Sequence, residues 1–109
     1  MRKIINGKRY DTDKAIEIGY YNNIGDSASS SSDFSWWEAT LYKTPRSQSY
    51  FIAGRGGPMS RFSQSCGQNQ WSGGSDLIPM SKTEAMEWAE THLGVDAIEK
   101  HFADMIEDA

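Results

Sequence analysis

The sequence predicts an α+β fold, in which helices pack on a small antiparallel sheet and two of them end the chain. Three observations indicate this class. Short extended segments separated by turn-forming residues occupy the first two thirds of the chain. Apolar residues with helical spacing follow Ser81. The length of 109 residues is that of one domain with a single core, so we expect one domain over residues 1–109.

The first 20 residues predict a hairpin and then a helix. The pair Asn6-Gly7 is the strongest two-residue turn signal and joins two short extended segments. A helix is expected to begin near Asp13, after an N-cap at Asp11 or Thr12. The apolar side of this helix would comprise Ala15, Ile16, Gly19 and Tyr20.

The middle of the chain predicts a loop and the most regular hairpin. Residues 26–33 contain five serines and are expected to form a flexible loop, because they offer nothing to bury. From Phe34 to Tyr42, apolar residues on both faces predict a central strand. A turn around Pro45 would join it to a returning strand over residues 49–53.

Glycine and turn-forming residues dominate the next segment. Pro58 predicts the first turn of a short helix through Met59, Phe62 and Ser65. Residues 66–75 predict a loop whose one large side chain is Trp71. Long loops are uncommon in compact domains unless they are functional, so this loop is a candidate site.

The C-terminal part predicts one brief strand and two helices. Pro79 indicates that a strand over residues 77–80 lies at an edge of the sheet. Ser81 and Glu84 form a capping box, Gly94 ends the first helix, and the second begins near Asp96. The expected buried residues are Ala85, Trp88, Ala89, His92 and Leu93 in the first helix, and Ile98, Phe102, Met105 and Ile106 in the second.

The composition excludes several classes of protein. A single cysteine, Cys66, allows neither an intrachain disulfide nor a cysteine-based zinc cage. Two histidines nine residues apart match no ligand spacing, so no metal and no cofactor are expected. No apolar run reaches the roughly 20 residues of a membrane span, and the N-terminus turns polar too soon for a secretory signal. We therefore expect a cytoplasmic protein that does not associate with membranes.

The sequence offers little support for catalysis. A nucleophilic Cys66 would need His92 or His101 within hydrogen-bond reach, and the spacing does not suggest it. His92 lies on an apolar helix stripe, which is typical of a core or boundary histidine. The glycine-rich segment 54–57 lacks the Gly-Lys-Ser/Thr ending of a phosphate-binding loop. We expect a protein that is not an enzyme.

The charges divide along the chain. The net charge of −4 combines nine basic and six acidic residues in positions 1–73 with two basic and nine acidic residues in positions 74–109. The basic part also holds Trp36, Trp37, Tyr42 and Tyr50, so it could bind nucleic acid, with basic residues on the backbone and aromatic rings on the bases. The alternative is that these rings form the core. The basic residues are Arg2, Lys3, Lys8, Arg9, Lys14, Lys43, Arg46, Arg55 and Arg61.

The acidic part predicts helices with negatively charged outer sides. Such a face is usually only solvated, but it could also imitate phosphates and occupy a basic groove of a nucleic-acid enzyme. We weigh this second possibility modestly above a basic surface that binds nucleic acid. The residues concerned are Glu84, Glu87, Glu90, Asp96, Glu99, Asp104, Glu107 and Asp108.

Short motifs spread over most of the chain carry a resemblance. They are KIINGKRYDT at residues 3–12, GGPMS at 56–60, CGQN at 66–69 with Trp71 and Gly73-Gly74 after it, IPMS at 78–81 and EAMEWAE at 84–90. Together they resemble a group of small proteins encoded on bacterial phages, plasmids and integrative elements. The serine-rich loop looks like an insertion, and the Pro45 turn differs from the shorter turns of that group.

The resemblance implies a counter-defence role and no catalytic residues. Accessory proteins from this genomic setting include anti-CRISPR inhibitors, which dock on Cas proteins. We therefore expect an inhibitor that binds a host Cas effector in the bacterial cytoplasm; the alternative is a nucleic-acid-binding accessory or regulatory protein. The expected partner-binding residues are Arg55, Arg61, Gln68, Asn69 and Trp71 in the loop region, and Glu84, Glu87, Glu90 and Asp104 on the helices.

Overall fold

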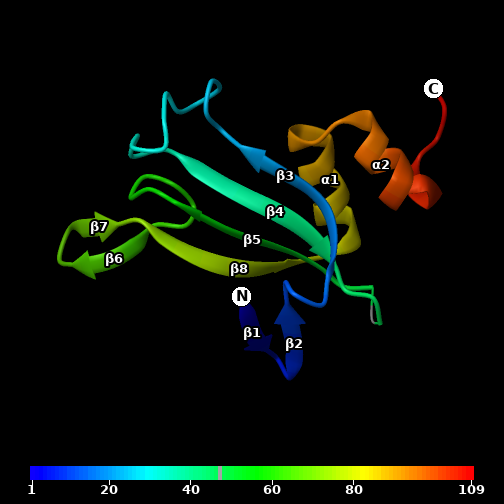
Figure 1. Cartoon of the computed structure of the whole chain (residues 1–109), viewed down its shortest axis with the longest axis horizontal. Helices are drawn as coiled ribbons and strands as arrows, with labels where there is room; N and C mark the ends of the chain where they lie inside the picture. Colours follow the sequence, from blue (N-terminus) through cyan, green and yellow to red (C-terminus); the bar gives the residue numbers. More distant parts are fainter. Residues whose placement is uncertain (47) are drawn as a thin grey trace.

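A four-stranded antiparallel sheet forms the centre of the molecule (Figure 1). The computed structural model describes residues 1–46 and 48–109. The strands pair in the order β3-β4-β5-β8, and the α+β class with its two C-terminal helices is confirmed. The bounds of these strands are β3 Ile16–Asn22, β4 Trp37–Lys43, β5 Tyr50–Gly56 and β8 Gly74–Met80.

Two hairpins and a helical segment complete the fold. The first hairpin joins β1 (Arg2–Ile5) to β2 (Lys8–Asp11), and the second joins β6 (Gln64–Gly67) to β7 (Gln70–Ser72). The chain ends with α1 (Lys82–His92), α2 (Val95–His101) and a short 3₁₀ helix, η1 (Ala103–Met105). Among the described residues, no helix is long and apolar enough to cross a membrane.

The helices cover one face of the sheet. Alternate residues of the central strands, such as Leu41 and Ile52, point to this face and are fully buried. Trp88 and Ala85 of α1 pack against them, and Phe102 stacks on Tyr50 with ring centroids 5.5 Å apart. Burial of such large side chains supplies the main stabilising free energy of a chain this short.

The β1–β2 hairpin covers part of the opposite face. Tyr10 packs edge-on against Phe51, with ring centroids 5.5 Å apart, and Leu77 belongs to the same buried cluster. Lys3 of β1 forms an ion pair of 2.7 Å with Asp76 of β8. The predicted turn is confirmed, because Asn6 and Gly7 both have positive φ, as the favoured two-residue hairpin turn requires.

The central strand, the edge strand and the helix cap are confirmed, whereas the second C-terminal helix is shorter than predicted, because it ends at His101 and contains no buried residue. β4 is an inner strand, and it pairs with β5 from Trp37 opposite Gly56 to Lys43 opposite Tyr50. The strand that contains Pro79 lies at the edge of the sheet, although it begins three residues earlier than expected. The Ser81 capping box is present. Phe102 is buried as predicted, whereas Ile106 is 40% exposed because the chain leaves the core after η1.

Two predicted helices are wrong. Residues from Asp13 to Tyr20 were expected to be helical, but Ile16–Asn22 forms strand β3, because β4 supplies backbone partners along this segment. The helix predicted at Pro58 is replaced by turns and by the start of β6. There the Ser60 hydroxyl donates to the Gly57 carbonyl at 2.7 Å and accepts from the Phe62 N–H at 3.2 Å, so it competes with helical hydrogen bonds.

The two predicted loops differ in detail. The serine-rich segment does bury a side chain, since Ala28 is only 6% exposed, and its backbone bonds to the Asn23 carbonyl. The central strand begins at Trp37 rather than Phe34, because Asp33 accepts from the backbone N–H of Ser35 and forms a turn before it. Much of the segment 66–75 belongs to β6, β7 and the start of β8 rather than to an irregular loop.

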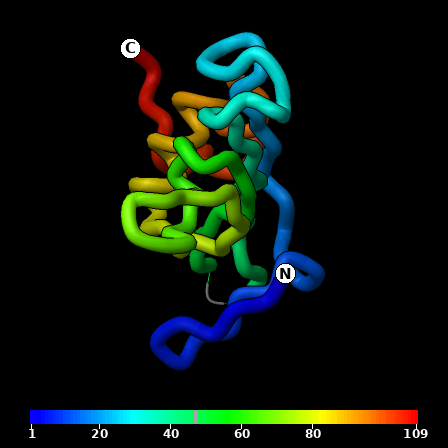
Figure 2. Tube along the Cα trace, turned by 90° about the vertical axis from the view of Figure 1, so that its left-hand side faces the viewer, coloured from blue at the N-terminus to red at the C-terminus, as the bar shows by residue number. Residues whose placement is uncertain are grey.

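The molecule is flat and extended for its length. Its principal extents are 46 × 36 × 21 Å, and its radius of gyration of 15.0 Å exceeds the roughly 13 Å typical of a compact chain this long. The two hairpins account for this shape: β6–β7 projects to one side (Figure 1), and β1–β2 lies at the end away from the C-terminus (Figure 2).

Candidate nucleic-acid interface

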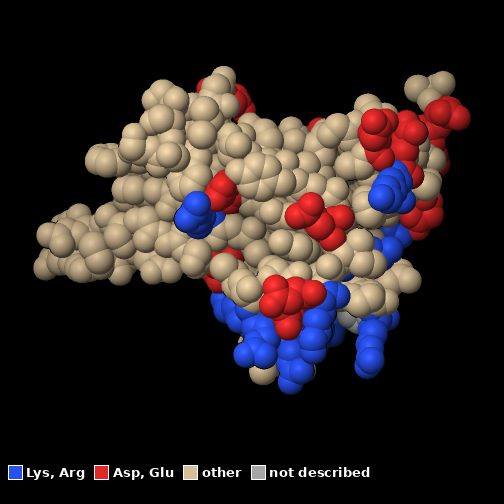
Figure 3. Space-filling model, in the orientation of Figure 1, with Lys and Arg blue, Asp and Glu red and all other residues tan. Residues whose placement is uncertain are grey.

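Basic side chains gather where the β1–β2 hairpin crosses the sheet (Figure 3). Four of them line one pocket together with residues of the turn after β4, and two more line a neighbouring hollow that shares Arg9. We call this surface the basic end. It comprises Arg2, Lys3, Lys8, Arg9, Lys14 and Arg46.

The fold brings these residues together from three segments. The hairpin places Arg2 opposite Asp11, and Ile4 opposite Arg9. Lys14 follows the hairpin, before β3 begins. Arg46 comes from the turn after β4, which is closed by a hydrogen bond of 2.8 Å from the Thr44 N–H to the Ser49 carbonyl. Residues more than 30 positions apart along the chain therefore share one surface.

Most of this positive charge is not compensated by ion pairs. Within residues 1–46 and 48–109, the ion pairs join Lys3 to Asp76, Arg55 to Glu38, and Lys82 to Asp104. Of the basic end, Lys3 alone is paired, and its hydrogen bond holds the pKa of the Asp76 carboxyl below its ordinary value. One carboxylate, Asp11, lines the pocket. The basic end therefore carries a net positive charge on a protein whose total charge is −4.

An uncovered part of the sheet adjoins the basic end. It forms a hollow of about 260 Å³ between the hairpin residues Met1 and Thr12 and the strand residue Arg55. We call this hollow the open sheet face. Tyr20, which is 51% exposed, also lines it.

A hydrogen-bonded group crosses the open sheet face. The Tyr20 hydroxyl donates to Glu38 at 2.7 Å, and Arg55 Nε donates to the other oxygen of Glu38 at 2.8 Å. Burial disfavours the charged form of Glu38, but these two hydrogen bonds outweigh it and lower the pKa of its carboxyl. The guanidinium of Arg55 also lies 5.6 Å from the ring centroid of Trp36. Glu38 thus holds Tyr20 and Arg55 in place at this surface.

The aromatic residues that the sequence offered for base stacking lie mainly in the two cores. Tyr50 is buried, and Trp37 packs against the helix-covered core. Tyr42 stacks on Phe51 with ring centroids 5.1 Å apart. These three rings support the alternative that they form the core. Tyr20, which the sequence predicted on the apolar side of a helix, is instead exposed on the open sheet face.

The predicted partner-binding residues of the loop region do not form one surface. Arg55 lies on the open sheet face. Arg61 lies near His92 of α1, whose pKa is lowered first by burial and also by the positive charge of Arg61. Gln68 and Asn69 are at the tip of the β6–β7 hairpin, and Trp71 follows on β7 with 61% of its surface exposed. The structure groups these last three residues together and leaves the two arginines apart from each other.

The predicted acidic residues lie on the helical segment. Glu84, Glu87 and Glu90 are all exposed on α1, where residues three apart are neighbours on the helix surface. Asp104 of η1 forms an ion pair with Lys82, so its charge is partly compensated. The three glutamates therefore form an acidic surface on the exposed side of α1, the helix that covers the face of the sheet opposite the β1–β2 hairpin.

The candidate catalytic residues have separate surroundings. Cys66 is exposed on the β6–β7 hairpin. His92 packs against Tyr21, Trp37 and Trp88, with ring centroids 4.5, 5.1 and 4.9 Å away, and burial lowers its pKa. His92 is therefore the boundary histidine that its helical position predicted. In the described part of the chain, no group of three or more His, Cys, Asp or Glu residues could hold a metal ion.

Comparison with protein-family models, curated proteins and solved structures found no match to this chain.

Proposed function

We propose that the protein binds nucleic acid through its basic end and acts by this binding rather than by catalysis. The observation that carries the proposal is the gathering of six basic residues from three segments. Of these six described residues, Lys3 is the one that forms an ion pair, with Asp76. Lysine and arginine side chains on one surface attract phosphates and release the counterions around them. This arrangement favours binding of nucleic acid over inhibition of a Cas effector through the acidic helices, which the sequence alone modestly favoured.

The open sheet face offers a continuation for a bound strand. It begins at the hairpin residues Met1 and Thr12 and ends at Arg55. Along it, Tyr20 presents a ring on which a base can stack, and Arg55 presents a guanidinium that is largely exposed. Single-stranded DNA or RNA, whose bases are accessible, is the form of nucleic acid that such a surface suits.

Charge reversal at the basic end tests this proposal. Fluorescence anisotropy would follow a labelled single-stranded oligonucleotide of about 12 nucleotides. We expect the double variant Lys8→Glu/Arg46→Glu to lower affinity at least ten-fold, because each reversal removes one phosphate contact and adds repulsion. The matched control Arg61→Glu/Lys100→Glu changes the net charge equally, away from the basic end, and should retain affinity to within about two-fold. Absence of binding at low ionic strength, or equal losses in both variants, would refute the proposal.

A counter-defence inhibitor that binds a host Cas effector in the bacterial cytoplasm is the second candidate. The exposed glutamates of α1 favour it, because they present a row of negative charge that could occupy a basic nucleic-acid groove. The test combines a pull-down against purified Cas effectors with an interference assay. We expect Glu87→Lys/Glu90→Lys to abolish capture and restore interference. Full interference with the unmodified protein across effector types would exclude this role.

A further inference from the structure

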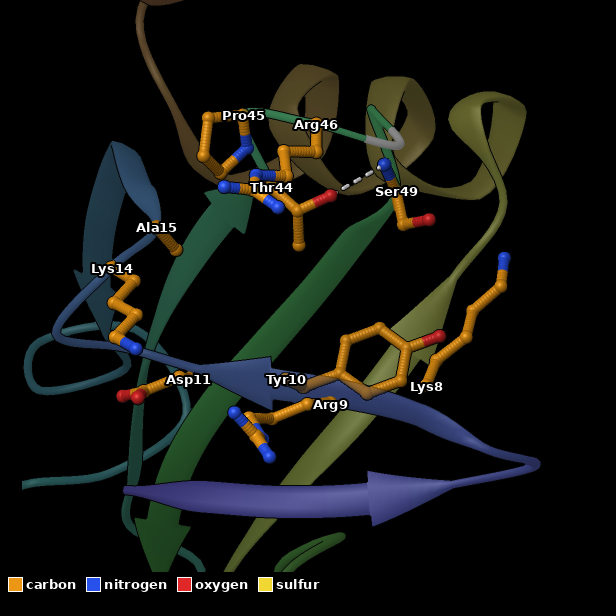
Figure 4. Close-up of a pocket in the computed structure, with 10 residues that line it drawn as sticks. All are labelled: Lys8, Arg9, Tyr10, Asp11, Lys14, Ala15, Thr44, Pro45, Arg46 and Ser49. Carbon is orange, nitrogen blue, oxygen red and sulfur yellow. Dashed lines mark hydrogen bonds between the residues drawn. The ribbon is translucent and has the colours of Figure 1, made fainter.

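The pocket at the basic end has the size of a small-ligand site. Its volume is about 370 Å³, within the range of about 300–1,000 Å³ that is usual for such sites. Strand β2 bounds it on one side and the turn after β4 on the other (Figure 4). A polymer that ran along the outer surface of the hairpin would not need this recess, so its presence requires a separate explanation.

The lining combines an apolar base with a charged rim. Tyr10 lines it with its ring, which is held edge-on against Phe51, and Ala15 and Pro45 add apolar surface. Four basic residues line the pocket, and three of their side chains, those of Lys8, Lys14 and Arg46, lie on the same side of β2 as the pocket (Figure 4). The side chain of Arg9 points away from it, toward β1 (Figure 4).

The number of positive charges discriminates between kinds of phosphate. A phosphodiester inside a strand carries one negative charge, whereas a terminal phosphate monoester carries about −1.5 to −2 at neutral pH and has three strong acceptor oxygens. Three cations around one recess exceed what a single diester would neutralise. A monoester engages more of their donors, with charge-assisted hydrogen bonds that are about twice as strong as neutral ones.

The remaining lining suits the rest of a nucleotide. A base or sugar can pack on the apolar surface of Ala15 and Pro45 and on the small part of the Tyr10 ring that stays exposed. The Asp11 carboxylate already accepts the Asp13 N–H at 3.0 Å and keeps acceptor capacity for a sugar hydroxyl or a base amino group. A negatively charged group would be repelled at this side of the pocket, so the phosphate belongs toward the basic rim.

We infer that this pocket binds the phosphorylated terminal nucleotide of a nucleic-acid strand, while the rest of the strand follows the open sheet face. The inference rests on the proposed function and adds to it a preference for strand ends that carry a phosphate monoester. It assigns Lys14 and Arg46 to the terminal phosphate, and Ala15, Pro45 and the exposed edge of Tyr10 to the nucleoside.

Oligonucleotides that differ only at their ends test the inference. Anisotropy would compare one sequence with a 5′-phosphate, with a 3′-phosphate and with hydroxyl groups at both ends. We expect one phosphorylated form to bind about ten-fold more tightly than the hydroxyl form, the gain of about one charge-assisted hydrogen bond. The phosphorylated end that binds more tightly identifies which strand end enters the pocket. Equal affinity for all three forms would overturn the inference and leave the proposed function standing, whereas absence of binding by all three would refute the proposed function itself.

Substitutions locate the preference in the pocket. Lys14→Gln/Arg46→Gln removes two exposed charges without touching the core and should reduce the phosphate preference to less than about two-fold. The control Arg61→Gln/Lys100→Gln should keep it, and a preference lost equally in both would overturn the inference. A titration of the unmodified protein with adenosine monophosphate, followed by NMR, provides a second measurement. Shifts should concentrate at Tyr10, Ala15 and Arg46, and shifts spread evenly over all basic surfaces, or none, would contradict it.

Discussion

Asn23 is a buried polar residue at the base of the serine-rich loop. Its Nδ2 donates to the Ser27 hydroxyl and to the Ser35 carbonyl, both at 2.9 Å, and its Oδ1 accepts the Trp37 N–H at 2.9 Å. Its backbone carbonyl accepts the Ala28 N–H. One side chain thus connects both ends of the loop to the first residue of β4, and it explains why a segment with few apolar residues has a defined path.

Replacing Asn23 tests this role. We expect Asn23→Ala to lower the free energy of unfolding by about 2 kcal/mol, because it leaves the part-buried Ser35 carbonyl and Trp37 N–H without their partner. Urea denaturation would measure the change. Gln68→Ala at the exposed hairpin tip is the control and should stay within about 0.5 kcal/mol. A loss no larger than that of the control would show that Asn23 does not organise the loop.

Helix α1 is the element whose bounds the sequence indicated best, because its start signal is local. The Ser81 hydroxyl accepts the Glu84 N–H at 3.1 Å, and the Glu84 carboxylate accepts the Ser81 N–H at 2.9 Å. This second hydrogen bond also lowers the pKa of Glu84. The helix carries Ala85 and Trp88 into the core, so its first turn contributes to the stability of the whole sheet.

Removing the cap tests its contribution. We expect Ser81→Ala to lower the free energy of unfolding by about 1 kcal/mol, the usual effect of losing an N-cap. The control is Thr83→Ala, two residues on, which replaces an exposed residue with a better helix former and should be neutral or slightly stabilising. Chemical denaturation of both variants gives the comparison. Equal stability of Ser81→Ala and the unmodified protein would show that the cap contributes nothing measurable.

At the scale of the whole molecule, the charges are separated in space as well as along the chain. The basic end lies at the β1–β2 hairpin on one face of the sheet, and the glutamates are exposed on α1, which packs on the other face. At physiological ionic strength the Debye length is about 8 Å, so salt strongly screens exposed charges that lie farther apart than this. Each face can therefore attract its own partner despite a net charge of −4.

This independence gives a prediction that separates the two candidate functions. We expect Glu87→Gln/Glu90→Gln to change oligonucleotide affinity by less than about two-fold at physiological salt, and to raise it more at low salt, where screening is weak. Anisotropy titrations at the two salt concentrations would measure this, and a large change at physiological salt would contradict it. If the second candidate function applies, the same variant should instead weaken capture by a Cas effector.

Local signals in the sequence were enough for the elements that depend on near neighbours. The Asn6-Gly7 turn, the Ser81 capping box and the alternation along β4 each depend on residues a few positions apart, and the structure confirms all three. The prediction of a helix over the segment that contains Ile16–Asn22 was wrong, because its short apolar pattern fits both the helical and the strand periodicity. Backbone pairing with β4, about 20 positions away along the chain, makes the segment a strand.

At the basic end, too, the sequence supplies the residues and distant contacts decide how they are arranged. The sequence already contained every one of its basic residues and the split of charge along the chain. Their gathering around one pocket depends on where the β1–β2 hairpin crosses the sheet, which the packing of Tyr10 on Phe51 and the ion pair of Lys3 with Asp76 set. Those contacts join residues 41 and 73 positions apart. Composition and local pattern hold no information about such distant pairs. The tertiary structure alone therefore determines the pocket and the positive charge around it.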